Sequence, residues 1–95
     1  METSKEEMMM LLRELQDLQT WLLNRGSKLS LIVTFCGNLK IISKVVYSRG
    51  LTYRNVEVTE NKSYNENLYN LKDFMDYVTK LEYGCEKGKP NQTPT

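Results

Sequence analysis

Hydrophobic residues follow a helical spacing at the start of the chain, alternate with polar residues in its middle, and return to a helical spacing afterwards. The first helical pattern follows Ser4-Lys5-Glu6-Glu7, in which a serine and a glutamate three residues later make the motif of a capping box. Its apolar positions are Met8, Leu11, Leu15, Leu18 and Leu22. The pattern ends at Asn24-Arg25-Gly26, and glycine is favoured just after a helix. We therefore expect a helix between Ser4 and Gly26.

The middle of the chain alternates between apolar and polar residues, which is the period of a strand with one buried side. This alternation covers residues 29–35 and 39–47, and a turn that contains glycine separates them. Residues 51–58 continue the pattern, but their apolar positions change phase, which indicates a bulge near Arg54 and Asn55. Together the three segments predict an antiparallel meander.

A second capping box, Ser63-Tyr64-Asn65-Glu66, precedes another helical stripe, which we expect to end at Gly84. The apolar positions of this stripe are Tyr64, Leu68, Leu71, Phe74, Met75, Val78 and Leu81. Residues 85–95 are almost entirely polar and predict a flexible tail. We expect residues 1–84 to form a single α+β domain of order αβββα. The simplest packing places both helices on one side of the sheet.

The alternation assigns the strand residues to the two sides of the predicted sheet. The side expected to face the helices contains Leu29, Leu31, Val33, Phe35, Leu39, Ile41, Val45 and Tyr47. The opposite side contains Ser30, Ile32, Thr34, Lys40, Ile42, Lys44 and Val46. A fully solvated side would be more uniformly polar, so we expect a partner to cover this mixed side.

Charge is distributed unevenly along the chain, although the net charge is only +1. No acidic residue occurs between Asp17 and Glu57, whereas six basic residues lie there. The candidates for binding an anionic group are Lys28, Lys40, Lys44, Arg49 and Arg54. A local excess of positive charge favours anionic partners, and the low net charge favours a short nucleic acid or a nucleotide over a long duplex.

Two kinds of binding function fit these features. The first is binding of short nucleic acid or a nucleotide by the basic side of the sheet. The alternative is a protein interaction module, such as a phage or mobile-element inhibitor that docks on an acidic surface of a host protein. A homodimer or larger homo-oligomer is also expected, because the chain is short and its first helix is apolar on more than one side. The candidate interface residues are Met9, Leu12, Trp21, Ile32, Ile42 and Val46.

The sequence offers little for catalysis. It has no histidine, which removes the commonest general base and metal ligand, and its five glycines form no phosphate-binding loop. Cys36 and Cys85 are far apart, so neither a zinc site nor a disulfide framework is expected. We therefore expect a non-enzymatic protein without a cofactor or bound metal. The acidic amino terminus and the shortness of the apolar runs predict a cytoplasmic protein that does not cross a membrane.

The predicted order of one helix, three strands and one helix resembles that of double-stranded RNA-binding domains and of some nucleoid-associated proteins. The resemblance implies a similar fold. It does not extend to the RNA-binding residues, because Asn65-Glu66-Asn67 stand where the RNA-binding family has a lysine cluster at the start of its second helix.

Overall fold

The computed structural model describes residues 2–36, 40–47 and 52–86, and each predicted element forms within them. The elements are α1 (Lys5–Asn24), β1 (Leu29–Phe35), β2 (Lys40–Tyr47), β3 (Thr52–Thr59) and α2 (Tyr64–Glu86). The strands are antiparallel and lie in the order β1-β2-β3. The α+β arrangement of order αβββα predicted from the sequence is therefore confirmed.

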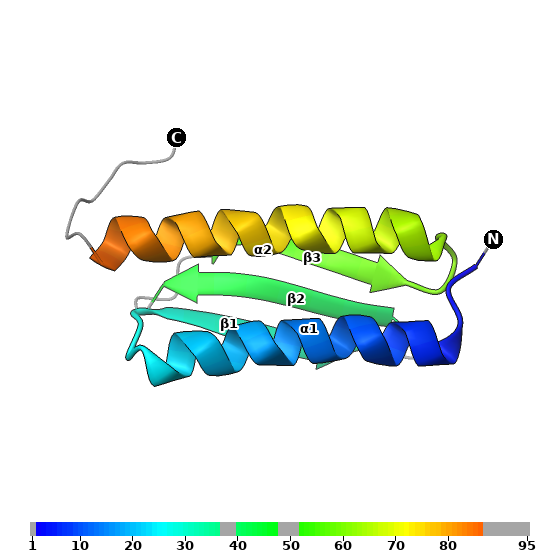
Figure 1. The fold of residues 1–95 in the computed structure, drawn as a ribbon, viewed down its shortest axis with the longest axis horizontal. Helices are drawn as coiled ribbons and strands as arrows, with labels where there is room; N and C mark the ends of the chain where they lie inside the picture. The colour runs from blue at the N-terminus through cyan, green and yellow to red at the C-terminus, as the bar shows by residue number, and fades with distance from the viewer. Residues whose placement is uncertain (1, 37–39, 48–51, 87–95) are drawn as a thin grey trace.

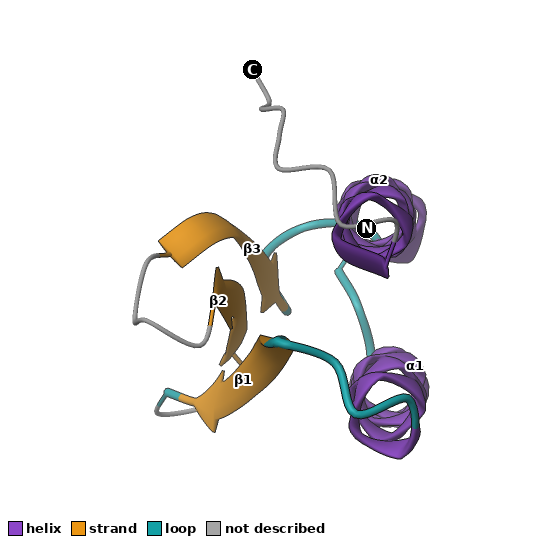
Figure 2. Ribbon diagram, turned by 90° about the vertical axis from the view of Figure 1, so that its left-hand side faces the viewer, coloured by secondary structure: helices purple, strands orange, loops and turns teal. Residues whose placement is uncertain are grey.

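Both helices lie against one face of the sheet, as the view along the helices in Figure 2 shows. α1 packs mainly on β1 and α2 mainly on β3, so each helix covers an edge strand. The two helices run in the same direction, and β2 is visible between them in Figure 1. Within the described residues no helix lies over the other face. The chain thus buries one side of its sheet and leaves the other side open.

The ends of α1 form as the local sequence indicates. Ser4 is the N-cap, its hydroxyl accepts a hydrogen bond from the amide of Glu7, and the carboxylate of Glu7 accepts one from the amide of Ser4. At the other end Gly26 has a φ of 66°, a left-handed conformation that glycine adopts at little cost. Short-range chemistry therefore sets both ends of this helix.

The end of α2 differs from the expectation. Ser63 caps its start by accepting a hydrogen bond from the amide of Glu66. The helix continues through Gly84 to Glu86, so the predicted end at Gly84 is wrong. Among the described glycines only Gly26 has a positive φ. A helical glycine costs only about 1 kcal/mol, so Gly84 alone does not stop the helix.

The predicted bulge lies in β3, one residue earlier than expected. Val45 is opposite Arg54, whereas Val46 is opposite Thr52, so Tyr53 is the extra residue. Beyond this point the alternation places Arg54, Val56 and Val58 on the side that faces the helices.

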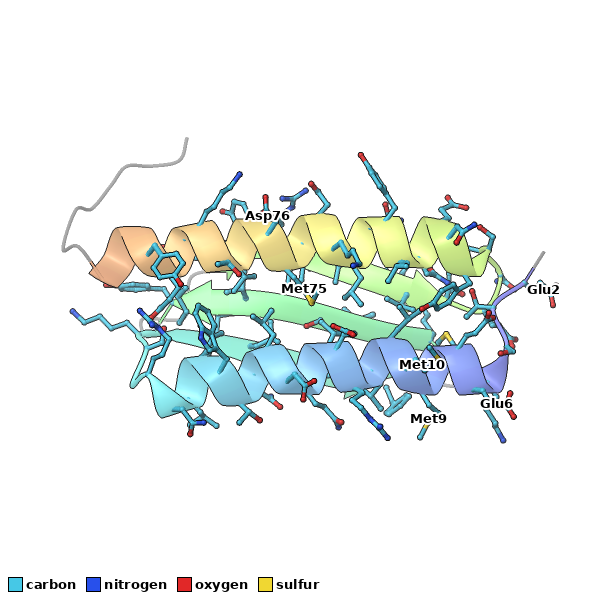
Figure 3. The ribbon with its side chains drawn as sticks, in the orientation of Figure 1. Glu2, Glu6, Met9, Met10, Met75 and Asp76 are labelled. Carbon is cyan, nitrogen blue, oxygen red and sulfur yellow. The ribbon has the colours of Figure 1, made fainter. Side chains whose placement is uncertain are left out.

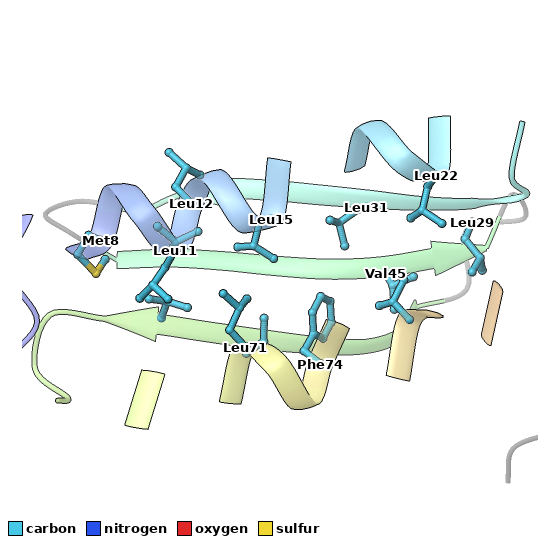
Figure 4. Packing of buried hydrophobic residues seen from close by; sticks show 14 residues of the cluster. Met8, Leu11, Leu12, Leu15, Leu22, Leu29, Leu31, Val45, Leu71 and Phe74 are labelled. Atoms are coloured by element: carbon cyan, nitrogen blue, oxygen red, sulfur yellow. The ribbon is translucent and has the colours of Figure 1, made fainter. Parts of the chain in front are cut away.

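The core lies between the helices and the sheet, as Figure 4 shows. Its buried residues are Met8, Leu11, Leu12, Leu15, Leu22, Leu29, Leu31, Ile41, Val45, Val56, Val58, Leu71, Phe74 and Val78. Of the residues expected to face the helices, Val33 and Tyr47 pack partly against this cluster, and Leu39 lies outside the described residues. Phe35 lies opposite Ile41 on the side that faces the helices, as expected, but it is 57% exposed. It is the last residue of an edge strand, where no further strand shields it.

Two polar groups join the helices at their ends. At one end the amide nitrogen of Asn67, which is buried, donates to Thr3 Oγ1 and to the carbonyl of Thr59, both at 2.8 Å. At the other end the carboxylate of Glu82, which is also buried, accepts from Arg25 Nε at 2.9 Å and from the hydroxyl of Ser27. Because each buried polar group is paired, neither carries the full cost of desolvation.

Ser43 is an exception in the interior. It lies on β2 between Ile41 and Val45, it is fully buried, and its hydroxyl has no hydrogen-bond partner. We predict that Ser43→Ala raises the free energy of unfolding by about 1 kcal/mol, because it removes an unpaired polar group. Urea unfolding monitored by circular dichroism measures this change. The matched control is Ser30→Ala on the open side, which we expect to change stability by less than about 0.5 kcal/mol. A loss of stability in Ser43→Ala would show that the hydroxyl is paired.

The hydrogen bonds to the buried carboxylate of Glu82 should contribute more to stability than an exposed ion pair in the same helix. We predict that Glu82→Ala lowers the free energy of unfolding by about 3 kcal/mol, because it removes the buried carboxylate that accepts hydrogen bonds from Arg25 and Ser27. Asp76→Ala breaks the exposed pair with Lys80 and should cost less than about 0.5 kcal/mol. Equal effects in the two variants would contradict a structural role for Glu82.

Candidate interaction surface

The side of the sheet away from the helices, here named the open face, is the candidate site. The strand register arranges its side chains in rows across the three strands. They are Ser30, Ile32 and Thr34 from β1, Lys40, Ile42, Lys44 and Val46 from β2, and Asn55, Glu57 and Thr59 from β3. The open face is therefore built from regular strands, whose side-chain directions are fixed by the backbone.

Aliphatic side chains surround one lysine in the open face. Lys44 is exposed and lies opposite Ile32 on one neighbouring strand and Asn55 on the other. Ile32 is 43% exposed, and Ile42 and Val46 are partly exposed. Lys44 makes no ion pair with the described residues. The site thus combines apolar surface with an available positive charge.

Glu57 brings a negative charge to the open face that sequence reasoning did not assign to it. Its carboxylate lies 3.0 Å from the ammonium group of Lys40. Both side chains remain about half exposed, at 42% for Lys40 and 48% for Glu57. The signal was present in the sequence, because Glu57 alternates with Val56 and Val58. Lys40 is consequently less available to an anionic ligand than its sequence position suggests.

Arg54 lies on the opposite side of the sheet from Lys40 and Lys44. Its guanidinium nitrogen is 2.6 Å from the carboxylate of Asp73 in α2, and its central carbon lies 5.0 Å from the ring centre of Tyr77. The expectation that Arg54 joins the two lysines is therefore wrong, and the bulge at Tyr53 explains why. Arg54 instead connects β3 with α2.

Of the two remaining candidate cations, the structure describes only Lys28, which lies away from this surface. Lys28 is exposed in the turn between α1 and β1, and Arg49 lies outside the described residues. Of the four predicted anion-binding residues that the structure describes, Lys40 and Lys44 share the open face.

The predicted oligomer interface is divided among three environments. Ile32, Ile42 and Val46 lie on the open face, and Met9 is 55% exposed on α1. Leu12 belongs to the core, and Trp21 packs partly against it. The ring of Trp21 also contacts that of Tyr83 at a centroid distance of 6.1 Å, and the guanidinium of Arg25 lies over it. The chain itself thus uses Trp21 and Leu12 for its own packing.

The positions of aromatic rings and of candidate metal ligands among the described residues also bear on what the open face can bind. Phe35 and Tyr47 lie on the helix side by their register, and the ring of Tyr53 contacts that of Tyr47. The described residues of the open face therefore offer no aromatic ring for stacking. In the described part of the chain no three His, Cys, Asp or Glu side chains gather into a possible metal site. Neither described helix has a stretch that is apolar enough to cross a membrane.

The chain matches no protein-family model, and searches of curated proteins and of solved structures find no significant match.

Arg54 and Lys44 lie on opposite sides of the sheet, so replacing each of them should affect stability differently. We predict that Arg54→Met lowers the free energy of unfolding by about 1–2 kcal/mol, because Arg54 both pairs with Asp73 and stacks on Tyr77. Lys44→Met, on the open face, should change it by less than about 0.5 kcal/mol. Thermal and urea unfolding of the two variants measure the difference. If Lys44→Met is the more destabilising change, the assignment of these residues to opposite sides is wrong.

Proposed function

We propose that the chain is a small cytoplasmic binding protein, without a catalytic role, that docks on a partner protein through the open face. The observation that carries the proposal is the exposed or partly exposed group of Ile32, Ile42 and Val46 around Lys44, which makes no ion pair within the described part of the chain. Its partner has an apolar patch that bears at least one carboxylate. An inhibitor or adaptor that acts by occupying a surface of its target fits this description.

The balance of charge favours a protein over a nucleic acid. Affinity for nucleic acid depends on cations that neutralise phosphates, but Lys40 is paired with Glu57 and Arg54 with Asp73. Single-stranded nucleic acid also stacks its bases on aromatic rings, and the described residues of the open face provide none. Protein interfaces, in contrast, combine an apolar centre with a few polar contacts.

The aliphatic residues supply affinity and Lys44 supplies selectivity. Complete burial of one aliphatic side chain contributes about 1.5–3 kcal/mol, so three partly exposed side chains can support a specific contact. A single lysine adds less to affinity, but it speeds association with an acidic surface and disfavours basic ones. This division predicts that changes to Ile42 and Lys44 have separable effects.

The proposal can be tested with a photo-crosslinking amino acid in place of Ile42. We expect irradiation in native host cells to join this variant to a second protein in one discrete adduct. Adding Lys44→Glu should reduce the adduct about tenfold, because it places like charges against the acidic partner. The control carries the same crosslinker in place of Tyr69, which is 72% exposed on α2, and should give no adduct.

Three outcomes would contradict docking on a protein. They are the absence of an adduct from position 42, equal adducts from positions 42 and 69, and an adduct that contains only copies of this chain. Nucleic acid is tested separately with a short labelled single strand at low salt. Binding that is lost in Lys40→Glu combined with Lys44→Glu would support a nucleic-acid function instead.

A further inference from the structure

One side of α1 forms a second exposed surface, here named the α1 flank. It consists of Met9, Gln16, Gln19, Thr20 and Leu23, while Leu12 lies beneath it in the core. Figure 3 shows Met9 projecting from the side of α1 that is turned away from α2, whereas Met10 projects toward α2. Gln19 donates a hydrogen bond to the carbonyl of Leu31 in the edge strand β1. The α1 flank therefore faces sideways, beside β1, and differs from the open face.

The α1 flank carries no charged residue between Met9 and Leu23. The six charged residues of α1 are Lys5, Glu6, Glu7, Arg13, Glu14 and Asp17. Met9 is 55% exposed and Leu23 is 74% exposed. A strip of four turns without charge, with large apolar side chains at both ends, is the composition expected at the centre of a protein interface.

The position of Phe35 extends this apolar strip onto the sheet. β1 runs opposite to α1 in Figure 1, and the hydrogen bond places Gln19 level with Leu31. Phe35 is four residues further along β1, or about 13 Å. The same distance along α1 corresponds to about nine residues and ends near Met9 and Met10. The exposed ring of Phe35 is thus near the level of Met9.

We propose that a second copy of the chain occupies the α1 flank, with the two α1 helices side by side and antiparallel. Met9 and Leu23 are equally distant in sequence from Gln16. A twofold axis beside Gln16 therefore places Met9 of each copy against the partner's Leu23, and the two Gln16 amides face each other. The flank is complementary to itself in this arrangement, as a twofold interface requires.

Charge selects the antiparallel direction. Residues 2–7 contain Glu2, Glu6 and Glu7 against Lys5 and have a net charge of −2. At the other end of α1 Lys28 adds a positive charge, whereas the charge of Arg25 is balanced by Glu82. An antiparallel pair brings these opposite ends together and also aligns the helix dipoles favourably. A parallel pair would oppose like charges at both ends. Lys28 is exposed and lies outside the open face. In this dimer it would lie near the acidic end of the partner's α1.

This dimer would join the two domains within one layer of helices, so both open faces point in the same direction. The inference does not rest on the proposed function, because it uses a different surface. It gives the protein two equivalent docking faces side by side, which would strengthen binding to a target that carries two sites.

Light scattering coupled to gel filtration of the full chain tests the dimer. We expect twice the mass of one chain for the wild type and half of that value for Met9→Glu combined with Leu23→Glu. The matched control, Tyr69→Glu on α2, should remain a dimer, because Tyr69 is as exposed as Leu23 but lies outside the α1 flank. A monomeric wild type, or a dimer that survives the double change, would overturn the proposal.

A disulfide tests the geometry directly. In a chain with Cys36→Ser and Cys85→Ser, we expect Gln16→Cys to form a covalent dimer on mild oxidation, whereas Asp17→Cys, next in sequence but off the flank, should not. Ile42→Glu should leave this dimer intact. Loss of the dimer in Ile42→Glu would instead place the second copy on the open face and would contradict both this inference and the proposed function. A dimer without a photo-crosslinked partner would contradict the proposed function alone.

Discussion

Both helices pack on the same side of the three-stranded sheet, and the rest of the structure depends on this one-sided burial. On the covered face Ile41, Val45 and Val58 are completely buried. The same strands carry Ile32 and Ile42 on the other face, where the described chain has no third layer to cover them. The described part of the chain thus buries one core and leaves apolar surface on the other face of the sheet. Both proposals follow from this imbalance, one on the sheet and the other on the side of α1.

Features set by local chemistry could be predicted from the sequence, whereas those set by distant neighbours could not. The cap at Ser4 and the turn at Gly26 depend on residues that are adjacent in sequence. The side of the sheet on which Arg54 lies depends on the position of one extra residue, because a shift of one position reverses every side chain after it. The change of phase revealed the bulge but did not fix its place. For Phe35, the alternation predicts on which side of the sheet the ring lies, but not whether another element covers the ring.

The burial of polar residues in α2 also could not be predicted from the sequence. By residue type Asn67 and Glu82 suit the solvated side of a helix, and both are buried in α2. Their partners Thr3 and Arg25 lie 64 and 57 residues away in the sequence. No local pattern contains that information. On the candidate site, sequence reasoning placed Lys40 and Lys44 together correctly, but it did not place Glu57 beside them, so it overestimated the positive charge of the surface.

The hydrogen bond between Thr3 and Asn67 connects the residues before α1 to the first turn of α2. Thr3 is buried, and its backbone amide also donates to the carbonyl of Glu60 in the turn before α2. Without Thr3 the buried side-chain amide of Asn67 would have one hydrogen-bond partner fewer. A change at Thr3 would therefore affect a helix that starts some sixty positions later, without altering either exposed surface.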